Sequence, residues 1–174
     1  MRRWLAIVPL LALAALAVVF TLRLKDGGDS HYTPTALVGK PMPDEALPPL
    51  AGGPPTPLKG EIRPATLVNF FASWCAPCIQ EAPALMALKA QGVRIVGVAW
   101  KDDPEKTKAM LAKVGDPYVR VLVDRDGAAG LDFGVSGVPE TYVIGADRKI
   151  LAKEARPLTA ESAERLLEKA DGAR

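Results

Sequence analysis

The chain has 174 residues, of which 49% are hydrophobic and 24% are charged. This length and composition predict a globular protein with room for one domain and a substantial core, and they exclude a disordered chain. The formal net charge is only +2 at pH 7, and Lys and Arg form no cluster. We therefore expect no nucleic-acid partner.

An apolar run follows the short tail of residues 1–3. It extends from Trp4 to Leu22 and is interrupted only by Thr21. As a helix, this run would be about 28 Å long, close to the roughly 30 Å hydrocarbon core of a bilayer. Because it lacks the amphipathic pattern of a soluble helix, we expect residues 4–22 to form a transmembrane anchor.

A cleaved signal sequence is the alternative for this run. Such a signal would need a shorter apolar core followed by small residues in an A-x-A-like site. The segment 18–23 is a poor cleavage site, which favours an uncleaved anchor. Positive charges flank both ends, so they decide the orientation only weakly. With residues 1–3 as a cytoplasmic tail, either alternative exports the rest of the chain.

Residues 23–36 are predicted to be a linker, and residues 37–174 to be the folded domain. Eight prolines fall between residues 34 and 57. Prolines at this density favour extended backbone and exclude helix. We interpret the first part of this region as a spacer, and expect residues 37–58 to lie along the surface of the domain.

The hydrophobic pattern becomes regular from residue 65 onward. It predicts strands over 66–71, 93–99, 119–123, 141–144 and 150–154, and helices over 77–90, 104–114, 128–133 and from Thr159 onward. Asp103 is a plausible N-cap of the second helix, which Gly115 would end. The first strands require parallel pairing through crossovers, and the last two form an antiparallel hairpin. The chain is therefore expected to be an α/β protein with a mixed central sheet flanked by helices.

Both cysteines of the chain lie in Trp74-Cys75-Ala76-Pro77-Cys78, where a buried strand passes into a helix. Pro77 is acceptable in the first turn of that helix. Unpaired N–H groups and the helix dipole would stabilise a thiolate at Cys75 and lower its pKa. Cys78, one turn along and shielded, could attack a mixed disulfide on Cys75. We therefore assign Cys75 as the nucleophile and Cys78 as the resolving thiol.

Other roles for the two cysteines fit the sequence less well. A c-type haem site would need His directly after the second cysteine, where Ile79 stands. A structural zinc site needs four ligands, and the chain adds only the distant His31. Binding of Cu(I) by both thiolates stays open, although no Met or His is placed to complete it. We expect no metal and no cofactor besides the redox-active disulfide Cys75–Cys78.

Four stretches carry a resemblance to a known family. They are Val38 to Pro43, Asn69 to Cys78 with Glu81 and Pro83, Gly97 to Asp102, and Gly134 to Thr141. The chain from Leu37 onward resembles the thioredoxin superfamily, and within it the membrane-anchored thiol-disulfide interchange proteins of cytochrome c maturation, the CcmG/DsbE type. Ala99-Trp100 departs conservatively from the Asn-Tyr pair of that group.

The resemblance implies a thioredoxin fold in which Pro139 is a cis proline that faces the disulfide. The backbone of Val138 would then be free to pair with a substrate strand that lies across Cys75. The alternative is that Pro139 is an ordinary proline at the start of a strand.

Two acidic residues are candidates for a supporting role. Glu81 lies one turn beyond Cys78, and Glu140 follows Pro139. Either could raise a thiol pKa or accept a proton during exchange, and either could equally be a solvated surface carboxylate. Asn69 stands where ordinary thioredoxins have a buried Asp. Because an amide cannot shuttle a proton, that role must be absent or filled by another residue.

The resemblance implies a protein-disulfide reductase in the periplasm, held on the inner membrane of a bacterium by a single span. Its expected substrate is apocytochrome c, or a thiol protein of the maturation complex, before haem is attached. Its expected electron donor is a membrane protein of the DsbD/CcdA kind. A general thioredoxin-like reductase or an oxidant of exported proteins is the alternative within the enzymes, and a Cu(I)-binding module or a structural adaptor is the alternative outside them.

Overall fold

The computed structural model describes residues 4–25, 36–63 and 65–171. The chain divides into two compact units, Met1–Tyr32 and Thr33–Arg174. The predicted cytoplasmic tail and most of the predicted linker, residues 26–35, lie outside the described residues.

The described part of the first unit, residues 4–25, forms the helix α1 (Trp4–Lys25), which has 22 residues and includes Pro9. It confirms that the apolar run is helical and adds three residues at its C-terminal end. Among the side chains that the structure describes, no helix offers a stretch long and apolar enough to cross a bilayer.

The second unit is built on a five-stranded sheet with the strand order β5-β4-β3-β6-β7. The strands are β3 (Thr66–Phe71), β4 (Ile95–Trp100), β5 (Arg120–Asp124), β6 (Glu140–Ile144) and β7 (Ile150–Glu154). β3 pairs in parallel with β4, and β4 with β5, whereas β6 is antiparallel to both β3 and β7. The predicted mixed sheet is therefore confirmed, with strand ends shifted by at most two residues. Every residue of β3 is buried, because this central strand is covered on both faces.

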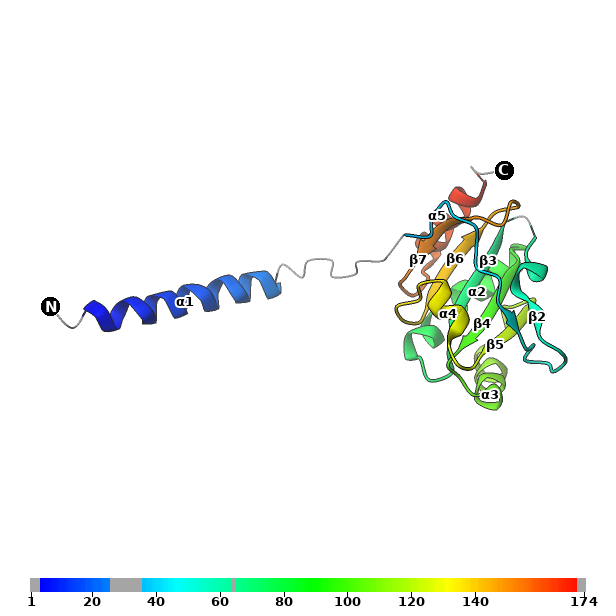
Figure 1. Cartoon of the computed structure of the whole chain (residues 1–174), viewed down its shortest axis with the longest axis horizontal. Coiled ribbons are helices and arrows are strands. Elements are labelled where there is room, and N and C mark those ends of the chain that lie inside the picture. The colour runs from blue at the N-terminus through cyan, green and yellow to red at the C-terminus, as the bar shows by residue number, and fades with distance from the viewer. Residues whose placement is uncertain (1–3, 26–35, 64, 172–174) are drawn as a thin grey trace. The chain divides into compact units, whose positions relative to one another are not determined.

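Both faces of the sheet are covered (Figure 1). The helices are α2 (Ala76–Ala90), α3 (Pro104–Val114), α4 (Ala128–Asp132) and α5 (Ala160–Asp171). Side chains of α2, α3 and α5 share one hydrophobic core, while α4 contributes to the core on the opposite face. Asp103 caps α3 as predicted, since its side chain accepts hydrogen bonds from two N–H groups of the first turn.

The second core is completed by residues 37–62, which we call the strap. As expected, residues 37–58 lie along the surface of the domain, and more than half of them are exposed. The expectation that this proline-rich segment contains no helix is wrong at its C-terminal end, where a short 3-10 helix begins. The strap contains β1 (Ala46–Leu47), β2 (Thr56–Pro57) and the 3-10 helix η1 (Leu58–Glu61). Four of its side chains are buried in the core: Met42, Leu47, Leu58 and Ile62. Their burial offsets the cost of ordering an irregular segment.

The strap also binds both outer strands of the sheet (Figure 1). At β7, the N–H of Gly39 donates to Ile150, and the N–H of Ile150 donates to Lys40. At β5, the N–H of Leu50 donates to Val121, and the N–H of Val123 donates to Pro48. The strap therefore runs from one edge of the sheet to the other.

Candidate active site

The two cysteines form a disulfide at the N-terminus of α2, directly after β3. Cys75 is the N-cap, and its Sγ lies 3.1 Å from the backbone nitrogen of Cys78, which donates to it. Pro77 occupies the first turn of the helix, as predicted. Both cysteines are nearly covered, with exposed fractions of 3% and 4%. In the reduced protein, the same N–H group and the helix dipole would stabilise a thiolate on Cys75.

The loop before β6 faces this disulfide. The Val138–Pro139 peptide bond is cis, as the resemblance implied. The carbonyl oxygen of Val138 lies 3.4 Å from the Sγ of Cys75. The structure thus brings Val138 and Pro139 to the nucleophile across 63 residues of chain.

Asp102 holds the segment that leads into the cysteines. Its carboxylate accepts hydrogen bonds from the N–H and the hydroxyl of Ser73, both at 2.7 Å, and from Thr107 and the N–H of Asp103. Burial favours the neutral acid, but these hydrogen bonds outweigh it and hold the pKa of Asp102 below its usual value. Trp74 follows Ser73 and is 59% exposed, with its indole N–H donating to the carbonyl of Lys101. Asp102 thus fixes the backbone next to an exposed aromatic side chain.

Glu81 is completely buried, with an exposed fraction of 0%, so the alternative of a solvated surface carboxylate is wrong. Its Oε1 accepts a hydrogen bond from the Asn69 amide at 3.0 Å, and its Oε2 accepts one from the N–H of Leu158 at 2.9 Å. Burial raises the pKa of Glu81 to about 7, and these two hydrogen bonds limit the rise. Near neutral pH, Glu81 can therefore both accept and return a proton.

Glu140 has a different environment. Neighbouring residues of a strand face opposite sides of a sheet, and here Thr141 bonds Asn69 on the α2 side. The Glu140 carboxylate instead accepts hydrogen bonds from Ser136 and Tyr142, and pairs with Lys153 at 2.8 Å. These contacts join the loop that carries Val138 to β6 and β7, and none of them is to a cysteine.

The Asn69 side chain connects three elements beneath the cysteines. Its amide nitrogen donates to Glu81 and to the hydroxyl of Thr141, both at 3.0 Å. Its amide oxygen accepts a hydrogen bond of 2.7 Å from the Tyr118 hydroxyl. Burial, followed by the negative charges of Glu81 and Asp116, raises the pKa of Tyr118 well above its usual value. Tyr118 and Thr141 carried no sequence signal for this role, because they meet Asn69 only through the sheet.

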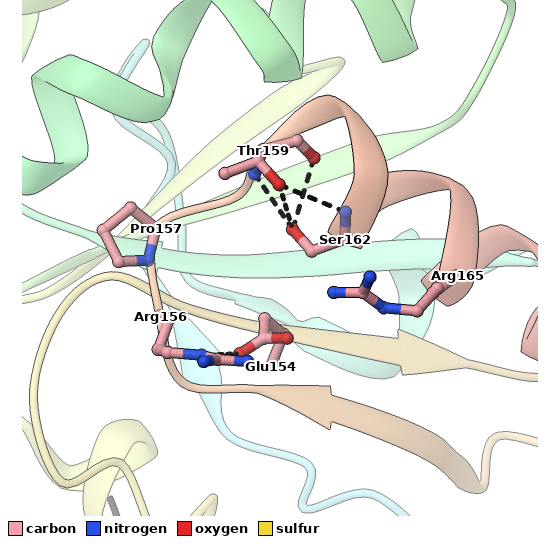
Figure 2. A pocket seen from close by; sticks show the side chains of 6 residues that line it. All are labelled: Glu154, Arg156, Pro157, Thr159, Ser162 and Arg165. Atoms are coloured by element: carbon pink, nitrogen blue, oxygen red, sulfur yellow. Dashed lines mark hydrogen bonds and ion pairs between the residues drawn. The ribbon is translucent and has the colours of Figure 1, made fainter. Parts of the chain in front are cut away.

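A hollow of about 380 Å³ opens beside the N-terminus of α5. Figure 2 shows the side chains that line it: Glu154, Arg156, Pro157, Thr159, Ser162 and Arg165. Both arginines are ion paired, Arg156 with Glu154 and Arg165 with Glu161, so these four charges cancel. Among the residues that the structure describes, no three His, Cys, Asp or Glu side chains gather to hold a metal ion.

Comparisons with known proteins agree with this geometry. Residues 37–169 match the family model described as Redoxin. The chain is 42% identical over 163 residues to the thiol:disulfide interchange protein HelX of Rhodobacter capsulatus, an alignment that covers 91% of this chain and 90% of that protein. It is 36% identical to the thiol:disulfide interchange protein DsbE of Escherichia coli, covering 91% of this chain and 88% of that protein.

Among solved structures, the chain is similar to a DsbE thiol:disulfide interchange protein from Chlorobium tepidum. The TM-score is 0.63 at 28% identity, over 75% of this chain and 94% of that one. The fold is therefore the thioredoxin fold, and the Cys75–Cys78 pair is the redox-active disulfide of an oxidoreductase. The chain belongs to the Redoxin family and, within it, to the thiol:disulfide interchange proteins of the CcmG/DsbE type.

Proposed function

We propose that this protein is a membrane-tethered reductase that reduces disulfides of apocytochrome c, or of a thiol protein that handles it, outside the cytoplasm. The observation that carries the proposal is the Cys75–Cys78 disulfide at a helix N-terminus, 3.4 Å from the Val138 carbonyl oxygen. A general reductase would share this site, so the choice of substrate depends on the family.

The reaction follows from the positions of the two sulfurs. The Cys75 thiolate attacks the substrate disulfide, forms a mixed disulfide and releases one substrate thiolate. Glu81 takes the proton of the Cys78 thiol, and the new thiolate attacks the Sγ of Cys75. The Cys75–Cys78 bond forms, the mixed disulfide breaks, and the second substrate thiolate leaves. Two electrons pass from the cysteine pair to the substrate. A membrane electron donor of the DsbD/CcdA kind then supplies two electrons that reduce the Cys75–Cys78 disulfide again.

The substrate is expected to bind as an extended segment across Cys75. Val138 precedes a proline that has no N–H group, and its carbonyl oxygen faces the reacting sulfur. Backbone pairing with Val138 would hold a substrate cysteine over Cys75 without selecting a side chain. Trp74, more than half exposed, offers an apolar surface next to it.

Two features support the choice of substrate and location. The resemblance of residues 69–78, 97–102 and 134–141 is to interchange proteins of cytochrome c maturation. The apolar run from Trp4 to Leu22 supports a single-span anchor in a bacterial inner membrane, with the catalytic domain in the periplasm. An anchor confines donor and acceptor to one surface and raises their effective concentration.

The test is the reduction potential of the Cys75–Cys78 disulfide, measured with the full chain in detergent against a glutathione buffer and followed by tryptophan fluorescence, to which Trp74 next to Cys75 contributes. We expect a value near or below about −270 mV, the potential of thioredoxin. Reduction of an apocytochrome c disulfide is then the activity assay, and Cys75→Ser is the inactive control.

A potential near about −120 mV, typical of a strong oxidase, would contradict the reductase. Tight Cu(I) uptake without exchange would instead favour the metal-binding alternative.

A further inference from the structure

The Asn69 amide lies at the centre of a buried polar network on the α2 side of the sheet. Asn69, Glu81 and Thr141 have no exposed surface, and Tyr118 is buried as well. They come from β3, α2, β6 and the segment before β5. Three hydrogen bonds join Asn69 to the other three residues. A fourth hydrogen bond runs from the N–H of Leu158 to the second carboxylate oxygen of Glu81.

The orientation of this amide is set from both ends. The nitrogen end meets two acceptors, the Glu81 carboxylate and the Thr141 hydroxyl, whereas the oxygen end meets the Tyr118 hydroxyl. A flipped amide would direct Oδ1 at the Glu81 carboxylate and replace attraction with repulsion. The contact pattern therefore fits one orientation, in which Asn69 donates to the ionised form of Glu81.

Tyr118 reaches Asn69 because Gly97 leaves room for its ring. A Cβ at Gly97 would lie 2.9 Å from ring atoms of both Tyr118 and Phe71. The two rings stack with centroids 4.7 Å apart. The position of the Tyr118 hydroxyl is thus fixed by packing, independently of the hydrogen bond that it makes.

We propose that Asn69 is a positioning residue of the exchange reaction: its amide, held by Tyr118 and Thr141, stabilises the Glu81 carboxylate as the proton acceptor for Cys78. The inference rests on the proposed reductase activity. It gives the amide a role that a carboxyl group at the same position could not have while Glu81 is present.

The reason is charge. An acidic residue in place of Asn69 would bring a second carboxyl group to hydrogen-bonding distance of Glu81 in a buried site. Two such groups cannot both ionise, and they would share one proton. Exchanging the two side chains avoids this problem. In Asn69→Asp/Glu81→Gln, the glutamine amide can donate to the new carboxylate while its oxygen accepts from Leu158.

The titratable groups that face Glu81 are few. Cys78 lies one turn before Glu81 on α2, and Cys75 caps that helix. The segment before β5 contributes Tyr118, whose pKa is raised by burial, and Asp116, whose charge acts on Tyr118. The groups presented by β3, β6 and the loop before α5 are the Asn69 amide, the Thr141 hydroxyl and the N–H of Leu158, which do not titrate in this range. In the oxidised protein, a titration near neutral pH within this network therefore reports on Glu81.

The experiment measures the carboxyl C=O stretching band of the oxidised full chain in detergent by infrared difference spectroscopy against pH. Loss of the band in Glu81→Gln identifies it. The wild-type midpoint is expected near 7. In Asn69→Leu, which removes a hydrogen bond to the charged form, the midpoint should rise by about one pH unit. Tyr118→Phe should raise it less, because the amide stays but loses its anchor.

Thr66→Val is the matched control. Thr66 is buried on the same strand, and its hydroxyl bonds the backbone of Arg63 rather than Glu81. This variant loses buried hydrogen bonds and stability, and its midpoint should stay at the wild-type value.

The exchanged variant, Asn69→Asp/Glu81→Gln, keeps the test valid if Asn69→Leu does not fold. It should recover both a carboxyl band and faster reduction of glutathione disulfide than Glu81→Gln alone. An unmoved midpoint in Asn69→Leu, or an exchanged variant no faster than Glu81→Gln, would overturn the role of Asn69. Wild-type protein that does not reduce glutathione disulfide would instead count against the proposed reductase, whatever the infrared midpoints are.

Discussion

Glu81 shows what a single buried carboxyl group costs the folded protein. Its pKa rises from 4.5 to about 7 on folding, mainly because burial penalises the charge. Below about pH 4.5 the group is protonated in both states. Between there and pH 7 the unfolded chain loses the proton first, so stability falls as the pH rises. Above pH 7 no further change comes from this group.

We expect the oxidised protein to lose about 3 kcal/mol of unfolding free energy between pH 4.5 and 7 through Glu81. Glu81→Gln should show a flatter profile over this range, because a glutamine does not titrate. Urea unfolding at a series of pH values measures both curves. Parallel profiles for wild type and variant would show that Glu81 has an ordinary pKa.

Asp102 makes the opposite contribution, since its pKa is lowered and it works as an ionised acceptor. Asp102→Asn replaces one acceptor oxygen with a donor, so at least one of the four bonds to Ser73, Asp103 and Thr107 is lost. We expect the free energy of unfolding to fall by about 1–3 kcal/mol at neutral pH, and the tryptophan fluorescence to change because Trp74 follows Ser73. The loss should shrink as the pH falls below about 3.8, because there Asp102 of the unfolded wild-type chain takes up a proton while the folded carboxylate stays ionised.

Asp103→Asn is the matched control for this variant, because asparagine caps a helix about as well as aspartate. Denaturant unfolding of the two variants compares how much each of the neighbouring carboxylates contributes to stability. Equal stability of both variants would contradict the role given to Asp102.

At the scale of elements, the loop before β6 depends on one buried ion pair. Lys153 on β7 and Glu140 on β6 pair at 2.8 Å, with side chains 2% and 1% exposed. The Lys153 amine also donates to the carbonyl of Gly134 at the start of the loop. Lys153→Met leaves the Glu140 charge buried without its cation, and should cost about 3–5 kcal/mol.

The double variant Lys153→Met/Glu140→Gln tests the cause. Because it removes both charges, it should be more stable than Lys153→Met alone. Urea unfolding gives the comparison. If the double variant is the less stable of the two, the single loss reflects packing of the lysine stem rather than the unpaired charge.

The elements that sequence could predict are those with a local signal. The buried run of β3, the Asp103 cap of α3 and the hairpin of β6 and β7 are each specified by neighbouring residues, and each is confirmed. The motif around Cys75 and Cys78 is local in the same way. For the strap, the sequence predicted the position along the domain surface but not the hydrogen bonds to β5 and β7, which exist only once the sheet has formed.

The same limit applies to the site. Glu81 was a candidate from its spacing to Cys78, but its burial depends on Leu158, 77 residues later. Tyr118 bonds Asn69 although 49 residues separate them in the sequence, and its ring fits there because Gly97 has no side chain. No periodicity or spacing in the sequence identifies such residues, because their contacts arise only in the folded structure.

At the scale of the whole molecule, the strap decides where the chain can be shortened. Residues 37–62 bury four core side chains, each worth about 1.5–3 kcal/mol. Their sum is comparable to the roughly 5–15 kcal/mol stability of a typical domain. A chain that starts at residue 64 should therefore fail to unfold cooperatively. A chain that starts at residue 36 should keep a sharp thermal transition, and circular dichroism against temperature distinguishes the two.

The strap also couples local opening at the two edges of the sheet. The backbone amides of Ile150 and Val123 lie on opposite outer strands, and both donate to carbonyl groups of the strap, those of Lys40 and Pro48. When the strap detaches, both amide hydrogens become open to solvent in the same event. In amide hydrogen exchange, the two should therefore show one common opening free energy, as a single cooperative unit spanning the width of the domain.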